Sequence, residues 1–260
     1  MEDMVTKAMN EMAAEKIQVR EPDLRAHGLV KAYGERTVVN GMDVACTCGE
    51  VVGLLGPNGA GKTTTFYMVV GLVQPNGGKV VFRGEDITRL PVFLRARKGL
   101  GYLAQEASIF RKLTVWENVM AILETLPMKA KARRQRAEEL LAPFDLMKVA
   151  KKPAYTLSGG ERRKLEIARA LVRNPAILML DEPFAGVDPL SVNEIQEIVK
   201  RLARQGLGII ITDHNVRETL SVVDRAYMVY DGRLLKEGTT AELIADEEVR
   251  TRYLGAGFRM

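Results

Sequence analysis

Apolar and polar positions divide the chain into strand-like and helix-like segments. Short runs at residues 51–55, 177–180 and 208–212, which are apolar at every position except Thr212, are typical of strands buried on both faces of a parallel sheet. Residues 114–126, which start on a Thr-x-x-Glu capping pattern, and residues 130–141 have the period of helices. The order of these segments predicts an α/β fold with an all-helical insertion.

Alternating patterns predict more strands near the two ends of this core. They lie at residues 29–33, 38–48 and 79–86, and Asp231-Gly232 predicts the turn of a late hairpin. We therefore expect one structured domain over residues 24–254, with the helical insertion at about 106–173 and a short tail at 255–260.

The first 23 residues form an extension ahead of this domain. Seven apolar residues recur there at helical spacing, namely Met1, Met4, Val5, Ala8, Met9, Met12 and Ala13. They predict an amphipathic helix whose other face is net acidic, which disfavours anionic lipid. It is either a loosely packed extension or a helix that binds a partner.

Composition and charge exclude several classes of protein. With 47% hydrophobic and 27% charged residues, the 260-residue chain has a globular composition, not that of a disordered tail. No apolar run approaches the ~20 residues that cross a bilayer, and charges interrupt the N-terminus where a secretory signal would be apolar. We expect a soluble cytoplasmic protein, in which Cys46 and Cys48 are reduced strand residues and not metal ligands.

The net charge is +5, with −3 in the first 23 residues and +8 in the remainder. Basic clusters lie at residues 95–98, 129–136, 148–152 and 162–164. We interpret them as solvated helix faces or as a sign of a nearby anionic membrane. Because no aromatic residues are interleaved for base stacking, we expect no nucleic-acid partner.

A glycine-rich segment directly follows the apolar run at 51–55. Gly56-Pro57-Asn58-Gly59-Ala60-Gly61-Lys62-Thr63 fits the phosphate-binding pattern G-x-x-x-x-G-K-[ST] between a strand and a helix. Its backbone N–H groups would surround phosphate oxygens at the positive end of the helix. We expect Lys62 to reach the β- and γ-phosphates and the Thr63 hydroxyl to ligate Mg²⁺.

Two acidic residues, Asp181 and Glu182, end the apolar run that begins at 177. The ends of parallel strands form the rim of the ligand crevice, so Asp181 would face the metal at the glycine-rich loop. Glu182 is suited to act as the general base or to orient water. The alternative, a cap or an ion pair, explains the cost of two buried acids less well.

The segment Leu157-Ser158-Gly159-Gly160-Glu161 indicates which class of nucleotide-hydrolysing protein this is. Ser158 and Glu161 form a capping box, but two glycines in a first turn each weaken a helix by about 1 kcal/mol, which suggests that an anion approaches the backbone there. The segment resembles the signature motif of the ABC ATPase family. That resemblance implies a P-loop NTPase with a RecA-like core, an N-terminal antiparallel β subdomain and an inserted α-helical subdomain.

The resemblance extends to further motifs, in the order that the family has them. It implies that Tyr33 stacks on adenine, that Gln105 senses Mg²⁺ and the attacking water, and that His214 contacts the γ-phosphate. Asp188 would couple two sites across a dimer, although it also fits a simple helix cap. The implied nucleotide contacts, some of them on ATP held by a second subunit, are Tyr33, Asn58, Gly59, Gly61, Lys62, Thr63, Thr64, Ser158 and Gly160.

Within that family the segments around residues 63–71, 105–111, 181–189 and 212–220 are similar to ATP-binding subunits of lipopolysaccharide export systems. This implies a homodimer that binds ATP and Mg²⁺ on the cytoplasmic face of the inner membrane, beneath two membrane subunits that receive Phe110 and Arg111. Ala104 departs from the proline that many relatives have before the glutamine. The C-terminal residues also resemble branched-chain amino-acid importers, and a soluble ABC protein or a scaffold without hydrolysis are more distant alternatives.

Overall fold

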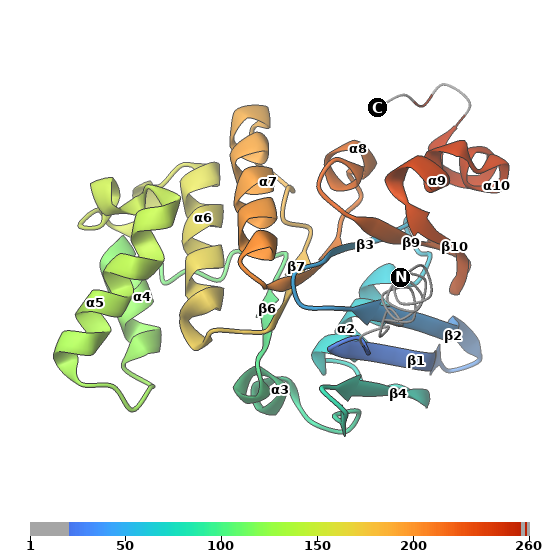
Figure 1. Cartoon of the computed structure of the whole chain (residues 1–260), viewed down its shortest axis with the longest axis horizontal. Helices are drawn as coiled ribbons and strands as arrows, with labels where there is room; N and C mark the ends of the chain where they lie inside the picture. Colours follow the sequence, from blue (N-terminus) through green and yellow to red (C-terminus); the bar gives the residue numbers. More distant parts are fainter. Residues whose placement is uncertain (1–20, 256–257, 259–260) are drawn as a thin grey trace, which may run out of the picture.

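The computed structural model describes residues 21–255 and Phe258, and its centre is a six-stranded sheet (Figure 1). Across the sheet the order is β10 (Arg233–Thr239), β9 (Arg225–Tyr230), β3 (Val51–Leu55), β8 (Gly208–Thr212), β7 (Ile177–Asp181), β6 (Leu100–Leu103). The strands from β9 to β6 run parallel and β10 is antiparallel to β9. The three apolar runs of the sequence are β3, β7 and β8, and all their residues are buried.

A second sheet packs on one side of this core. It is antiparallel, in the order β2 (Arg36–Cys46), β1 (Leu24–Tyr33), β4 (Gly77–Phe82), β5 (Glu85–Asp86). The helix α2 (Lys62–Val70) contributes Phe66 and Met68 to one apolar cluster with residues of both sheets. The loop that leads into α2 is therefore held between two sheets.

The helical subdomain lies at the other end of the molecule (Figure 1). It consists of α4 (Val115–Leu123), α5 (Ala130–Leu141) and α6 (Gly159–Ala170), with 3₁₀ turns at Ala142–Phe144, Leu146–Val149, Ala154–Thr156 and Leu171–Arg173. The predicted capping box of α4 is present, because the Thr114 side chain accepts from Glu117 N and the Glu117 carboxylate accepts from Thr114 N. The helix ends at Leu123, earlier than predicted.

The remaining helices flank the central sheet. They are α3 (Val92–Lys98), α7 (Pro189–Arg204), α8 (Val216–Leu220), α9 (Thr240–Ala245), α10 (Glu247–Val249) and the π-helical turn Arg250–Leu254. Among the residues that the structure describes, none of the helices is both long and apolar enough to cross a membrane. The predicted helix in residues 1–16 lies outside the described residues, as does most of the 255–260 tail.

Candidate nucleotide-binding site

The glycine-rich loop joins β3 to α2 at the carboxyl edge of the central sheet. Gly61 is the N-cap of α2 with a φ of 98°, and a Cβ there would lie 2.6 Å from the Val38 carbonyl oxygen, so only glycine fits. Gly59 also has positive φ, and a Cβ on it would meet no described atom within 4 Å. The loop thus presents open backbone at the positive end of a helix, which is the arrangement that binds phosphate.

Lys62 lies over this loop. Its Nζ donates to the carbonyl oxygens of Gly56 at 2.6 Å and Pro57 at 2.9 Å. Burial lowers the pKa of Lys62. The ammonium group therefore stands over the loop interior, where the expected phosphates would lie.

Asp181 ends β7 at the same edge of the sheet and has the features of a metal ligand. Its side chain is 1% exposed, and its Oδ2 has no hydrogen-bond partner among the described residues. Burial raises the pKa of Asp181 to about 6, although a hydrogen bond with Tyr67 opposes the shift. A buried carboxylate oxygen without a partner is costly unless a cation offsets it.

A Mg²⁺ ion suits these donors. Thr63 stands on the first turn of α2, and the register pairs Asp181 with Thr212 of β8, the strand next to β3. The described residues form no group of three or more His, Cys, Asp and Glu side chains placed around a metal. Mg²⁺ usually takes one or two protein ligands and completes its shell with phosphate and water, so Thr63 and Asp181 fit it.

The structure brings Gln105, Glu182 and His214 together from the ends of β6, β7 and β8. Gln105 Nε2 donates to Glu182 Oε2 at 2.7 Å, and His214 Nδ1 lies 3.3 Å from the same oxygen. Glu182 has a φ of 45°, in the left-handed region that residues other than glycine rarely adopt. Its backbone N–H donates to Thr212 O at 2.7 Å, which helps to hold this turn.

Asp213 is a residue of this cluster that the sequence analysis missed. Its side chain is fully buried and accepts from the backbone N–H groups of Asn215 at 2.8 Å and Phe184 at 3.3 Å. Burial raises the pKa of Asp213. It fixes the turn that carries His214 against the turn that follows Glu182.

Arg163 on α6 is the second residue that was missed. Its guanidinium donates to the carbonyl oxygens of Ala104, Asp181, Glu182 and Pro183 at 2.9–3.1 Å. It also pairs with the buried carboxylate of Glu166 at 2.9 Å. One side chain therefore holds the backbone on both sides of the Gln105–Glu182 contact.

The interpretation of the basic clusters as solvated faces was wrong at two positions. Arg163 is 6% exposed, and Arg95 of α3 is 0% exposed. Arg95 donates to the carbonyl oxygens of Met68 and Val69 at the end of α2, at 2.8 and 2.6 Å. A signal was available for Arg163, because it lies three residues after Gly160 and four before Ile167, on the buried face of the helix.

Ser158 and Gly160 lie at the start of α6, in the helical subdomain, apart from α2 (Figure 1). The capping box is present, with Ser158 Oγ accepting from Glu161 N at 3.1 Å. Gly160 has a packing reason that differs from the predicted approach of an anion, since a Cβ there would lie 2.2 Å from Ser191 Oγ. Asp188 is the N-cap of α7, and its Oδ1 accepts from Ser191 N at 3.0 Å.

Tyr33 and Phe110 are exposed aromatic residues. Tyr33 ends β1 with 53% of its surface exposed, so it is not a core residue of the strand. Phe110 is 44% exposed, and the Arg169 guanidinium lies 4.6 Å from its ring centroid. Arg111 is exposed beside it. The cysteines are free, and Cys46 is the last residue of β2, whereas Cys48 lies in the turn after it, so the predicted strand position was wrong for Cys48.

Residues 39–185 match the model of the ABC transporter family. The chain belongs to that family. This ABC protein is 53% identical over 238 residues to the lipopolysaccharide export system ATP-binding protein LptB of Haemophilus influenzae, a match that covers 91% of this chain and 99% of the relative. It is 51% identical to a probable ABC transporter ATP-binding protein of Azorhizobium caulinodans, over 92% of this chain and 85% of that protein.

Solved structures agree with this membership. The ABC protein superimposes with a TM-score of 0.81 on the ADP conformation of MJ1267, an ATP-binding cassette of an ABC transporter, at 28% identity over 90% of this chain and 99% of that one. A dimeric ATP-binding cassette, MJ0796, bound to ADP and Pi in a post-hydrolysis state, gives a TM-score of 0.73 at 26% identity over 84% and 98% of the two chains. The predicted fold class and the predicted resemblance are confirmed.

Proposed function

We propose that this ABC ATPase hydrolyses ATP to drive an ABC transporter that extracts lipopolysaccharide from the inner membrane for export. The observation that carries the proposal is the 52–53% identity to LptB proteins of several bacteria, over 91% of this chain and 98–99% of theirs. The Gln105–Glu182–His214 cluster beside the phosphate-binding loop supports hydrolysis.

In this proposal the nucleotide lies on the loop at the start of α2. Tyr33 stacks on the adenine, and the backbone from Asn58 to Thr64 and the Lys62 ammonium bind the phosphates. Thr63, Asp181 and Gln105 would hold Mg²⁺, which when bound neutralises part of the phosphate charge.

Glu182 is the proposed general base. It accepts a proton from the water whose oxygen attacks the γ-phosphorus, as the bond from that phosphorus to the ADP oxygen breaks. Gln105 and His214 both contact Glu182 Oε2 and so orient the base. His214 is also the proposed contact to the γ-phosphate. Arg163 and Asp213 act as positioning residues for this cluster.

Two copies of the chain are proposed to enclose two ATP molecules, with Ser158 and Gly160 of one copy on the γ-phosphate held by the other. The separation of α6 from α2 within one chain is consistent with this arrangement. Phe110 and Arg111 are the proposed contacts to the two membrane subunits, which would place the dimer on the cytoplasmic face of the inner membrane. Closure of the dimer around ATP would move those subunits, and hydrolysis would release it.

The substitution Glu182→Gln tests the proposed base. It keeps the shape of the side chain but removes its basicity, so turnover should fall by at least about 100-fold while ATP affinity changes by less than about threefold. The substitution Glu124→Gln, at the exposed C-cap of α4, is the matched control and should hydrolyse ATP at the wild-type rate. Wild-type turnover in the Glu182→Gln protein would contradict the assignment.

The transported substrate is tested by purifying the Glu182→Gln protein with ATP from its own cell membranes. Recovery of two related membrane subunits with bound lipopolysaccharide supports the proposal. Recovery of permeases of an amino-acid uptake system would overturn the export function and leave the ATPase assignment in place.

A further inference from the structure

The positive charge of the chain is concentrated in the helical subdomain. Residues 106–173 contain 15 Lys and Arg against 8 Asp and Glu, a net charge of +7. The other residues contain 23 against 25, a net charge of −2. The whole-chain value of +5 therefore hides a strongly basic subdomain on a slightly acidic body.

A basic pocket of about 540 Å³ opens on this subdomain, at the start of α4. Three lysines, Lys148, Lys151 and Lys152, line it together with Trp116, Met147 and one carboxylate, Glu117, which is engaged in the capping box of α4. We refer to these residues as the Lys148–Lys152 pocket.

Backbone hydrogen bonds hold the walls of the pocket together. The N–H of Val115 donates to Lys152 O at 3.1 Å, and the N–H of Trp116 donates to Ala150 O at 2.9 Å. The lysine segment is thus fixed against the first turn of α4, so that the charged side chains extend from a defined backbone.

Two of the three ammonium groups are available to a ligand. The exposed Lys151 and Lys152 have no ion pair or side-chain hydrogen bond within the part of the chain that the structure describes. Lys148 contacts Asp145 at 3.1 Å, but both side chains are more than 75% exposed. Such exposed pairs contribute little and exchange readily for another anion.

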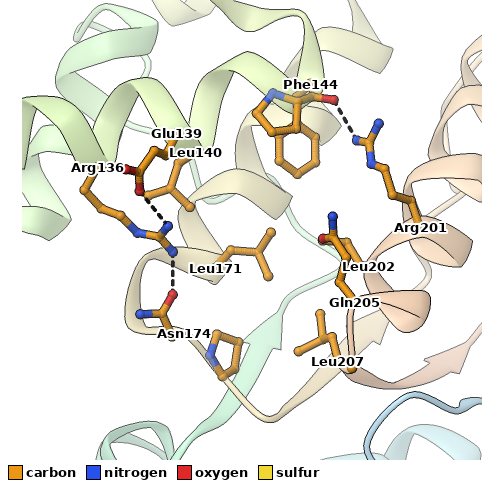
Figure 2. Close-up of a pocket in the computed structure, with 13 residues that line it drawn as sticks. Arg136, Glu139, Leu140, Phe144, Leu171, Asn174, Arg201, Leu202, Gln205 and Leu207 are labelled. Atoms are coloured by element: carbon orange, nitrogen blue, oxygen red, sulfur yellow. Dashed lines mark hydrogen bonds and ion pairs between the residues drawn. The ribbon is translucent and has the colours of Figure 1, made fainter.

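Another basic cavity, shown in Figure 2, differs in this respect. There Arg136 is engaged by Glu139 and Asn174, and Arg201 donates to the Pro143 carbonyl oxygen at 2.6 Å. Arg136 thus joins α5 to Asn174, and Arg201 joins α7 to the 3₁₀ turn Ala142–Phe144. In the Lys148–Lys152 pocket, in contrast, Lys151 and Lys152 form no ion pair with any residue that the structure describes.

The apolar residues of the pocket are of the kind found at membrane surfaces. Met147 is 41% exposed, and Trp116 is partly buried against the core. Tryptophan is enriched at the level of lipid headgroups, where its ring meets both apolar and polar surroundings. Lysine beside it supplies attraction to anionic lipid.

The pocket also adjoins the proposed contact to the membrane subunits, so the inference rests on the proposed function. The N–H of Ala154 donates to Leu113 O at 2.8 Å, and the N–H of Tyr155 donates to Arg111 O at 3.0 Å. The chain that forms the pocket is therefore continuous with the surface of Phe110 and Arg111.

We propose that the Lys148–Lys152 pocket binds the phosphate headgroup of an anionic phospholipid in the membrane that holds the transporter. The phosphate lies between the lysine ammonium groups, and Trp116 and Met147 contact the glycerol and the first acyl carbons. The contact adds a direct lipid anchor to the one through the membrane subunits.

The pocket contains its own probe, because Trp116 is the one tryptophan of the 260 residues. The full-length protein is titrated with phosphatidylglycerol vesicles and with phosphatidylcholine vesicles while tryptophan emission is followed. We expect a blue shift with phosphatidylglycerol alone, and its loss at 1 M salt, where the Debye length is about 3 Å. The triple variant K148Q/K151Q/K152Q should bind about 100-fold more weakly, at about fivefold per lysine.

A control variant removes the same charge elsewhere. Arg25, Lys79 and Arg89 are exposed on the antiparallel sheet or the turn after it, and R25Q/K79Q/R89Q should bind vesicles as the wild type does. Unchanged emission with phosphatidylglycerol, or equal losses in both triple variants, would overturn the proposal. The assay needs neither ATP nor membrane subunits, so its failure would leave the proposed function standing.

Discussion

Replacing Asp181 by asparagine should stabilise the nucleotide-free protein, although it removes a proposed metal ligand. The carboxyl is buried at 1% exposure with an unpartnered Oδ2, and its pKa rises from 3.8 to about 6. Because the folded pKa lies above the unfolded one, ionisation of Asp181 opposes folding. This cost is absent below about pH 4 and complete above about pH 6.

The magnitude follows from the two pKa values. A difference of this size corresponds to about 3 kcal/mol at 1.36 kcal/mol per unit, and to about half of that at pH 5. Asparagine has the same shape and no charge. Urea unfolding at pH 8 without nucleotide should therefore show D181N to be more stable by up to about 3 kcal/mol, which moves the midpoint by about 1 M.

The assay is repeated at pH 5 and then with ATP and Mg²⁺. The advantage of D181N should shrink by about half at pH 5, and ATP with Mg²⁺ should raise the melting temperature of the wild type much more than that of D181N. The substitution D188N is a control of opposite sign, since hydrogen bonds from Ser191 lower the pKa of the exposed Asp188. A D181N protein that is no more stable than wild type at pH 8, or equally favoured at both pH values, would refute the reasoning.

Three further predictions concern packing and positioning. The substitution R163K keeps the positive charge but loses most of the hydrogen bonds that the guanidinium donates to backbone carbonyl oxygens. Single-turnover hydrolysis should therefore slow by about 10- to 100-fold while ATP affinity, measured by titration, is retained. An equal loss of affinity would indicate a general structural effect. Placing alanine at Gly160 against Ser191 should cost about 1–3 kcal/mol of unfolding free energy, seen as a drop of several degrees in melting temperature, and S191G in the same chain should restore part of it. Replacing Arg95 by methionine leaves the carbonyl oxygens at the end of α2 unpaired and should cost about 2–4 kcal/mol in urea unfolding, whereas R97M on the exposed side of α3 should cost less than about 0.5 kcal/mol.

The local parts of the site were predictable because each is formed by residues that lie close together in the sequence. The phosphate-binding loop needs glycines, a lysine and a hydroxyl at fixed spacing between a strand and a helix, and the structure has that order at Gly56–Thr63. The apolar runs predicted the three buried parallel strands, since only strands covered on both faces are apolar at every position. Helix caps such as Thr114 and Asp188 were predictable for the same local reason.

The positioning of the proposed base was not predictable from local patterns. Arg163 belongs to a cluster of three basic residues that resembles a solvated face, and its four carbonyl acceptors are 18–59 residues away along the chain. Arg95 looks equally solvated, yet its side chain is fully buried against the end of α2. No sequence pattern distinguishes Asp213 from the other acidic residues, and only the fold shows that it is buried beside His214.

The sequence by itself thus determined the family and the fold class, and it supplied the residue types proposed to meet the nucleotide, because these depend on spacing and on apolar period. The tertiary structure decided which charges are buried, why Gly160 has no side chain, and how the ends of β6, β7 and β8 bring Gln105, Glu182 and His214 to one carboxylate oxygen. It also placed three lysines and the single tryptophan, Trp116, in the lining of one pocket. Such arrangements depend on contacts between segments that are distant in the sequence. The identity of a charged residue does not show whether the fold leaves its side chain in solvent or buries it.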